Sequence, residues 1–238
     1  MKLDILAIAA HPDDVEISCA GTLIKHIAKG YKAGIVDLTK GELGTRGSAK
    51  ERMKETEAST QSLGIQAREN LGFADGFFEN NKEHQLELVK LIRKYQPSIV
   101  LAPAKFDRHP DHGRGAQLSS DACFIAGLAK VETKLGGKLQ QAHRPKAVYH
   151  YIQALHMEPD FVVDITEYLE QKLNAIRAFK SQFYNPDSHE PETFISTPQF
   201  LEFVTARAIH FGVPSGIKYG EGFVTNRIPA LDDVMVLM

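Results

Sequence analysis

Short apolar runs alternate with segments of helical periodicity along the first two-thirds of the chain. The expected elements are strands at 3–10, 32–39, 69–73 and 97–103, and helices at 16–30, 49–64, 84–96 and 117–135. Strand–helix alternation is typical of a parallel sheet that is covered by helices on both faces. The sequence therefore predicts an α/β fold with a doubly wound, mostly parallel, Rossmann-like sheet.

The last third of the chain is less regular. Here we expect strands at 146–153 and 160–166, and helices at 166–183 and 198–212. A chain of 238 residues fits one large α/β domain, and the sequence contains no internal repeat, low-complexity tract or convincing linker. We therefore predict a single domain over residues 1–238.

Charge and hydropathy argue against several classes of partner. The 28 basic and 30 acidic residues give a formal charge of −2, and no basic stripe indicates nucleic-acid binding. The first apolar run is too short to span a bilayer, and the N-terminus does not read as a cleavable signal. We predict a soluble, cytoplasmic protein with no nucleic-acid or membrane partner. Cys19 and Cys123 lie in apolar, helix-like surroundings, and we interpret them as buried free thiols.

Polar loops follow three of the predicted strands. HPDD follows the first strand, KGELGTRG the second and FDRHPDH the fourth. In doubly wound sheets ligands bind at the carboxyl ends of the strands, where such loops converge. The sequence therefore predicts a functional site at this edge of the sheet.

Two HPD tripeptides, at residues 11–13 and 109–111, carry the chemistry of that site. A single HPD at a strand end is usually a turn in which His or Asp caps a helix. Two such loops in register with two parallel strands point instead to a shared site. His11, Asp14 and His112 form a two-histidine, one-carboxylate set, which suits zinc or ferrous iron and leaves a position open for water.

The remaining polar residues of these loops complete a hydrolytic set. Asp13 need not bind the metal and could accept a proton from the attacking water. His109 would face the developing oxyanion, with Asp111 fixing its tautomer and raising its pKa. Glu16 has two interpretations, either as a support for a metal ligand or as an acidic residue that is favourable in the first turn of a helix.

Arginines also gather on the predicted loops, at Arg46, Arg52, Arg108 and Arg114, with Arg144 further along the chain. Most surface arginines are simply solvated. A guanidinium beside the metal loop nevertheless suggests a substrate with carboxylate or phosphate groups. Other motifs are missing: there is no GxGxxG after the first strand, no P-loop lysine, no GxSxG elbow and no CxxC pair.

AHPDDVE with a downstream HPDH resembles the LmbE-like, or PIG-L, family of metal-dependent N-acetylglucosaminide deacetylases. IVDLTKGELGTRG, DRHPDH, AHRPKAVYHYIQ, PDFVVDIT and YGEGF are similar, in order, to the bacillithiol-biosynthesis branch. The resemblance implies a zinc-dependent N-deacetylase that hydrolyses the acetamide of N-acetylglucosaminyl-L-malate, an amino-sugar conjugate, in the bacterial cytoplasm. It also implies a homo-oligomer, a hexamer or smaller.

The same resemblance assigns roles residue by residue. It implies that His11, Asp14 and His112 bind Zn²⁺, or alternatively Fe²⁺, that Asp13 is the general base, and that His109, oriented by Asp111, is the acid or electrophilic partner. Arg52 and Arg108 match arginines around the malate part, and Arg144 matches a further arginine near the pocket. Phe200 stands where related enzymes often have a tyrosine, so His109 or another group such as Tyr184 would have to support the oxyanion.

Three alternatives remain at this point. The substrate could be another N-acetyl sugar conjugate. The chain could be a non-catalytic sugar- or nucleotide-binding module on the same fold, although both motifs are intact. A metallophosphatase would need a second metal and more ligands than the three predicted positions supply.

Overall fold

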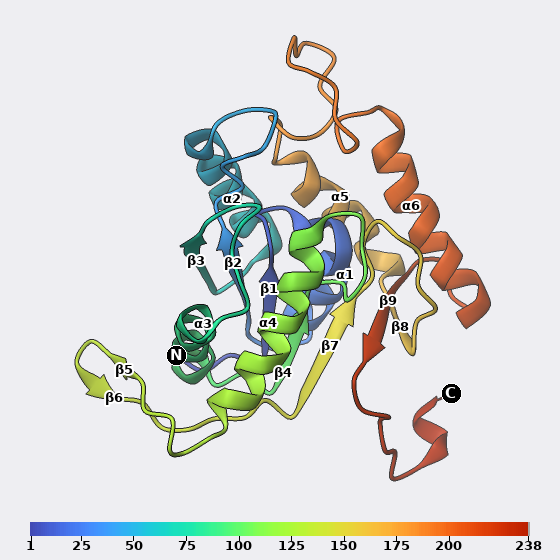
Figure 1. The fold of residues 1–238 in the computed structure, drawn as a ribbon. Coiled ribbons are helices and arrows are strands. Elements are labelled where there is room, and N and C mark those ends of the chain that lie inside the picture. Colours follow the sequence, from blue (N-terminus) through green and yellow to red (C-terminus); the bar gives the residue numbers. More distant parts are fainter. Residues whose placement is uncertain (238) are drawn as a thin grey trace.

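A computed structural model describes residues 1–237 (Figure 1). The first half contains β1 (Ile5–Ala9), α1 (Asp14–Ala28), β2 (Ala33–Thr39), α2 (Ala49–Leu63), β3 (Ala67–Phe73), α3 (Lys82–Tyr95), β4 (Ile99–Ala102) and α4 (Pro110–Ala126). The second half contains β5 (Lys134–Leu135), β6 (Lys138–Leu139), β7 (Ala147–Tyr151), β8 (Phe161–Asp164), η1 (Thr166–Tyr168), α5 (Leu169–Arg177), α6 (Gln199–Gly212), η2 (Val213–Ser215), β9 (Gly220–Thr225) and η3 (Val234–Leu237).

One sheet of seven strands organises the chain, in the order β3-β2-β1-β4-β7-β9-β8. The five strands from β3 to β7 are parallel to one another, and β9 runs antiparallel to both of its neighbours. The predicted doubly wound, mostly parallel α/β fold is therefore confirmed. The strand order reverses between β1 and β4, and this reversal creates the kind of crevice in which such sheets bind ligands.

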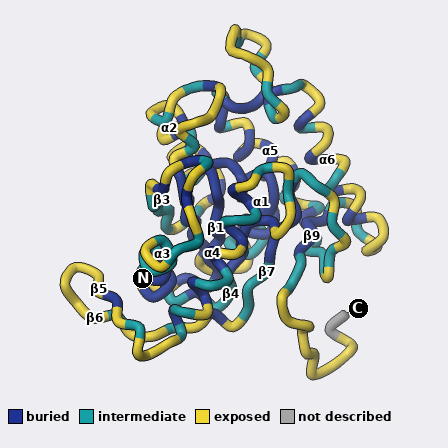
Figure 2. Tube along the Cα trace, in the orientation of Figure 1, coloured by how far each residue is buried: buried dark blue, intermediate teal, exposed yellow. Residues whose placement is uncertain are grey.

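Helices cover the two faces of the sheet, and β1 supplies side chains to both. Leu6 and Ile8 pack in one apolar cluster with residues of α3 and α4. Ala7 and Ala9 pack in a second cluster with residues of α1, α2 and α5. Because β1 is buried on both faces, it reads as a continuous apolar run in the sequence. Figure 2 shows these central strands buried, whereas the β5–β6 hairpin is exposed.

Several elements differ from the sequence-based expectation. The hairpin of β5 and β6 was not predicted, and the helix expected at 166–183 is divided into η1 and α5 and ends at Arg177. The helix expected at 117–135 begins at Pro110 and ends at Ala126. It begins early because proline is favourable in the first turn and because His109 accepts a cap bond from the Asp111 amide. Beyond its end, Arg93 donates to the carbonyls of Ala126 and Leu128. Strand β9 was not predicted, because the two glycines of GEGFVT weaken a strand signal.

Two further predictions can be compared with the structure. Cys19 and Cys123 are free and buried, as expected. Among the described residues, no helix combines the length and the hydropathy that a membrane crossing requires.

A buried ion cluster links three elements on the α1 face of the sheet. Arg68 on β3 donates to both carboxylate oxygens of Asp37 on β2, at 2.8 and 2.9 Å, and to Glu16 on α1 at 2.7 Å. Glu16 also accepts a bond from Ser59 of α2 at 2.6 Å. Glu16 lies in the first turn of α1, as the second interpretation has it. Its carboxylate also ties α1 to β3 and α2, and these partners are not predicted metal ligands.

We expect Arg68→Met to lower the free energy of unfolding by about 3–5 kcal/mol, because it leaves two buried carboxylates without their cation. Urea unfolding followed by circular dichroism measures this change. Arg177→Met is the matched control, because its pair with Glu170 is exposed and should contribute about 1 kcal/mol or less. Equal losses for the two variants would contradict this account of the cluster.

Candidate functional site

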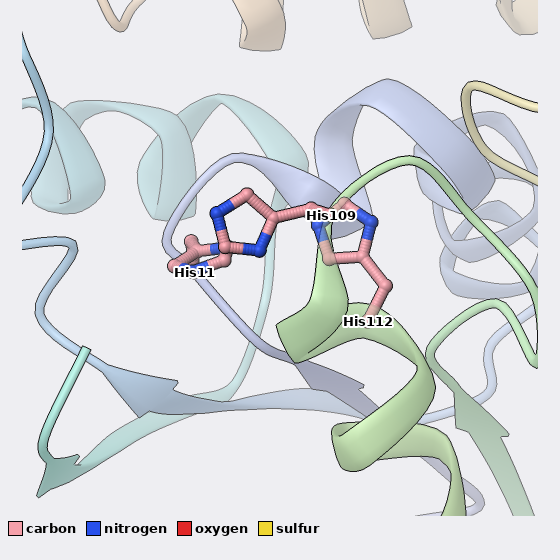
Figure 3. Close-up of side chains that lie close together, drawn as sticks. All are labelled: His11, His109 and His112. Carbon is pink, nitrogen blue, oxygen red and sulfur yellow. The ribbon is translucent and has the colours of Figure 1, made fainter. Parts of the chain in front are cut away.

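The predicted polar loops converge at the carboxyl ends of β1 and β4. There they line a cavity of about 350 Å³. His11 follows β1, and His109 and His112 lie at the N-terminal turn of α4, so that the three imidazoles gather in one place (Figure 3). The rings of His11 and His109 lie 4.6 Å apart, centroid to centroid. Two distant HPD tripeptides therefore contribute to a single site.

The backbone at Asp13 is held in an unusual conformation. Asp13 has φ 121° and ψ −21°, and residues other than glycine seldom adopt a positive φ of this size. Its side chain makes no cap bond to α1, although it occupies the N-cap position. The carboxylate lines the cavity instead, 3.1 Å from the Arg52 guanidinium. Strain of this kind costs on the order of 1–3 kcal/mol and is typical of functional sites.

His11 and His112 each lie beside the Asp14 carboxylate. His11 Nδ1 lies 3.4 Å from Asp14 Oδ2, and His112 Nε2 lies 3.2 Å from Asp14 Oδ1. Ligands about 2.0–2.1 Å from a tetrahedral zinc are separated by roughly 3.3 Å. Each of these two separations is therefore close to that between two ligands of one zinc ion, although the two nitrogens face different oxygens of Asp14. Among the described residues, His11, Asp14 and His112 are not one of the groups whose ligand atoms all lie within 4.8 Å of one another.

Two other groupings share His11. Ligand atoms of His11, His109 and His112 lie within 4.8 Å of one another, and so do those of His11, Asp75 and Asp111. In the second group, His11 Nε2 lies 3.0 Å from Asp75 and 3.3 Å from Asp111. Because a carboxylate only accepts, these contacts place a proton on Nε2 and leave Nδ1 to face Asp14.

Further polar groups orient the predicted ligands. Asp107 accepts a bond from His112 Nδ1 at 2.6 Å, which leaves Nε2 as the atom that faces Asp14. Gln153, at the end of β7, donates to Asp14 Oδ1 at 2.6 Å. A histidine that binds a metal usually donates its other N–H to a carboxylate in this way, and such a partner fixes the tautomer.

The charges of the cluster favour a bound cation. Although burial alone would lower it, the pKa of His112 is raised to about 9 by the charge of Asp14 and the bond to Asp107. Burial would likewise lower the pKa of His11, but hydrogen bonds to Asp111, Asp14 and Asp75 outweigh the effect of burial. The pKa of His11 therefore lies well above its usual value. Buried carboxylates thus draw protons onto both histidines. A divalent cation can supply the same positive charge to neutral imidazoles, so the donor set fits a metal.

The predicted pairing of Asp111 with the His109 ring is wrong. The Asp111 carboxylate contacts His11 and accepts a bond from the Gly76 amide at 2.8 Å. It is the Asp111 backbone amide that donates to His109 Nδ1, at 3.2 Å. Burial, followed by the charges of His11 and His112, lowers the pKa of His109 instead of raising it.

The predicted arginines divide into two groups. Arg52 and Arg108 line the cavity. Arg52 is buried and donates to the Pro12 carbonyl at 2.7 Å and to Gln182. Arg108 is exposed, and its guanidinium lies 4.5 Å from the centre of the Phe194 ring.

The other three arginines do not line the cavity. Arg46 donates to the carbonyls of Ser181 and Pro191. Arg114 donates to the Gly76 carbonyl and forms an ion pair with Asp111 at 3.0 Å. Arg144 stacks on Phe124 at 4.2 Å and donates to its carbonyl, near the far end of α4. Arg144 is therefore not placed to contact a substrate in the cavity, contrary to the prediction. Its position in the sequence does not indicate how far it lies from the cavity.

An apolar wall faces the polar cluster across the cavity. Phe194, Phe200 and Phe203 line it, and their ring centroids lie 5.6–6.4 Å apart. Phe200 is buried on α6, whereas Tyr184 is half exposed and does not line the cavity. Tyr184 therefore does not take the position that a tyrosine at residue 200 would occupy.

Sequence reasoning missed several residues that surround the predicted site. These are Asp75, Asp107, Gln153, Gln182 and Arg207, all of which contact a predicted site residue or line the cavity. Asp107 could have been found within FDRHPDH, since it lies one short loop before His112. The others are distant in sequence, and no local pattern marks them.

Comparisons with known proteins agree on one family. The family model described as PIG-L, GlcNAc-PI de-N-acetylase, matches residues 6–123. The chain is 31% identical to diacetylchitobiose deacetylase of Thermococcus kodakarensis over 228 residues, which cover 92% of this chain and 81% of that protein. It is 28% identical to a probable N-acetyl-α-D-glucosaminyl L-malate deacetylase 2 of Bacillus anthracis, over 75% of this chain and 81% of that protein. A crystal structure of a conserved protein from Thermus thermophilus has a TM-score of 0.86 and 34% identity, with 98% of each chain covered.

We expect Asp107→Asn to weaken Zn²⁺ binding by roughly 10–100-fold, because the partner that orients His112 loses its charge. Competition with a chelator measures the affinity of the metal-stripped protein. Asp121→Asn is the control, since Asp121 lies on the same helix but contacts Asn80 and Gln117 instead. Wild-type affinity in Asp107→Asn would show that His112 does not depend on this carboxylate as a ligand.

Proposed function

The chain belongs to the PIG-L family, and from that membership we propose that it is a metal-dependent deacetylase of an N-acetylglucosamine conjugate. The reaction adds water across the acetamide: the C–N bond breaks, acetate leaves and the nitrogen becomes a free amine. The observation that carries this proposal is the His11, Asp14 and His112 set with the Asp13 carboxylate in the same cavity.

The metal would be held by His11 Nδ1, Asp14 and His112 Nε2. When bound, it would polarise the acetamide carbonyl and make water a stronger acid. We propose Zn²⁺, with Fe²⁺ as the alternative that the same donor set accepts. Zinc content of the purified protein, measured beside iron content, tests this choice.

Asp13 is proposed as the group that takes the proton from the attacking water. Burial raises the pKa of its carboxyl to about 7, and the charges of Arg52 and His11 act in the opposite direction. A general base works best when its pKa lies close to the working pH. Arg52, held by Gln182 and the Pro12 carbonyl, keeps the carboxylate in place.

His109 is proposed as the donor to the carbonyl oxygen. Its Nδ1 accepts a hydrogen bond from the Asp111 amide, so a neutral ring must carry its proton on Nε2. The pKa of His109 is lowered, which keeps the ring neutral near pH 7. The backbone amide of Asp111, rather than its carboxylate, therefore sets the tautomer, and no tyrosine at residue 200 is required.

The conjugated group would bind between Arg108 and the apolar wall. Among the cavity-lining arginines Arg108 is exposed, and a guanidinium of this kind can pair with a carboxylate of malate. The Phe194 and Phe203 rings also suit stacking of a second sugar ring, and a relative of this chain is a diacetylchitobiose deacetylase. We propose the malate conjugate in the bacillithiol pathway as substrate, with a disaccharide as the second candidate.

Three further predictions from the sequence stay open to experiment. These are the single domain over residues 1–238, the cytoplasmic location and the assembly into a homo-oligomer, a hexamer or smaller. Sedimentation velocity of the purified protein measures the last of them.

We expect Asp13→Asn to retain the metal but to lower kcat by at least about 100-fold, the usual contribution of a general base. Because only the deprotonated carboxylate accepts a proton, wild-type kcat/KM should rise with pH up to about 7, the raised pKa of Asp13, or to a lower pH where a bound cation lowers it. Acetate release and metal content are measured together, with Asp121→Asn as the control. Loss of metal along with activity would make Asp13 a ligand instead.

We expect Arg108→Ala to raise KM for N-acetylglucosaminyl malate by roughly 10–100-fold, because a charge-assisted bond of about 1.5–3 kcal/mol is lost. KM for plain N-acetylglucosamine and for diacetylchitobiose should change far less. Release of free amine from the three substrates measures this difference. An equal change in KM for all three substrates would contradict the malate assignment. If the wild-type protein released no free amine from any of the three substrates, the proposed activity would be contradicted.

A further inference from the structure

Helix α1 is broken at Cys19, five residues after the predicted metal ligand Asp14. Cys19 has φ −137° and ψ 17°, which is not helical, so two helical segments meet at this residue. The first segment begins at Asp14, and the second begins next to Ala20. The break therefore separates the turn that carries Asp14 from the rest of the helix.

The second segment has a carboxylate at its start. Glu221 on β9 is buried, and it accepts the Gly21 amide at 3.0 Å and the Thr22 amide at 2.7 Å. Amides at the start of a helix carry a partial positive charge that favours an anion. Lys172 on α5 donates to the same carboxylate at 2.6 Å, which balances its charge. The second segment is thus fixed by β9 and α5.

The first segment is held by a cation. Arg207 on α6 donates to the Ile17 carbonyl at 2.6 Å, two residues before the break. The same guanidinium donates to the Gln153 carbonyl. Gln153 in turn donates through its side chain to Asp14 Oδ1 at 2.6 Å. One guanidinium therefore holds both the segment that carries Asp14 and the residue that orients the Asp14 carboxylate.

We propose that Arg207 is a positioning residue for Asp14, which it holds in its metal-binding orientation through the Ile17 and Gln153 carbonyls. An arginine suits this role because its planar fork donates to two acceptors at once, which an ammonium group does less well. The inference rests on the proposed function only in taking Asp14 to be a metal ligand. It gives α6 a part in metal binding in addition to its part in the apolar wall.

The test is the Zn²⁺ affinity of Arg207→Met in the metal-stripped, full-length protein. We expect a loss of roughly 10–100-fold, the usual effect of removing a group that orients a ligand. Arg207→Lys should recover part of the affinity, because it can reach one of the two carbonyls. In the zinc-loaded enzyme kcat should also fall, because the Asp14 carboxylate is displaced from its ligand orientation.

Arg93→Met is the matched control. Arg93 on α3 is a buried arginine that likewise holds backbone carbonyls, those of Ala126, Leu128 and Val131, beside the C-terminal end of α4. Its loss should lower the melting temperature and leave the Zn²⁺ affinity of the folded protein within about twofold of wild type, because no ligand of the site depends on it.

Wild-type Zn²⁺ affinity in folded Arg207→Met, or an equal loss of affinity in Arg93→Met, would overturn the proposal. If Arg207→Met does not fold, Gln153→Met tests the same route from its other end, and wild-type affinity there would also overturn it. Because the affinity is measured without substrate, a wild-type protein that binds zinc but releases no acetate would refute the proposed activity and not this inference.

Discussion

Buried negative charge at the carboxyl ends of β1 and β4 is the constraint on which the site depends. Asp13, Asp14 and Asp111 are nearly inaccessible to solvent, and a buried carboxylate without a partner is strongly unfavourable. The neighbouring groups answer this charge, with Arg52 beside Asp13 and His11 beside Asp14 and Asp111. A bound metal ion would also balance the charge of these carboxylates, because it would supply positive charge while the imidazoles stay neutral. The stability of the loops and the chemistry of the cavity thus have one electrostatic cause.

The sequence allowed the framework and the centre of the site to be predicted. Strand–helix alternation and the burial of β1 on both faces leave few topologies other than a doubly wound sheet. That topology brings the two HPD loops to one edge, where the structure places His11 and His112 on either side of Asp14. These predictions succeeded because each rests on local spacing and on one rule about where parallel strands end. Their roles in catalysis stay predictions until they are measured.

Contacts between distant segments could not be predicted in the same way. Asp111 lies two residues from His109, yet its carboxylate turns to His11, and only its backbone amide meets the neighbouring ring. Arg144 lies in AHRPKAVYHYIQ, a stretch that is similar to the family, but its side chain packs on Phe124. Glu16 pairs with Arg68 of β3. In each case the choice of partner depends on burial and on the geometry of the packed sheet, neither of which the local sequence contains.

The polar and the apolar wall of the cavity come from different parts of the chain. The region matched by the family model, residues 6–123, contains both HPD loops and therefore the proposed ligands and base. The apolar wall and the group that holds Ile17 come from α6 and the segment before it, outside that region. Under the proposed function, the polar wall would carry out the reaction and the facing wall would determine which conjugated group is admitted. Arg207 and Phe203 share α6, and the Arg207 guanidinium lies 5.5 Å from the centre of the Phe203 ring. If Arg207 positions Asp14 as proposed, changes that reshape the wall would act on the helix that holds the Asp14 turn, and substrate choice would be coupled to metal binding.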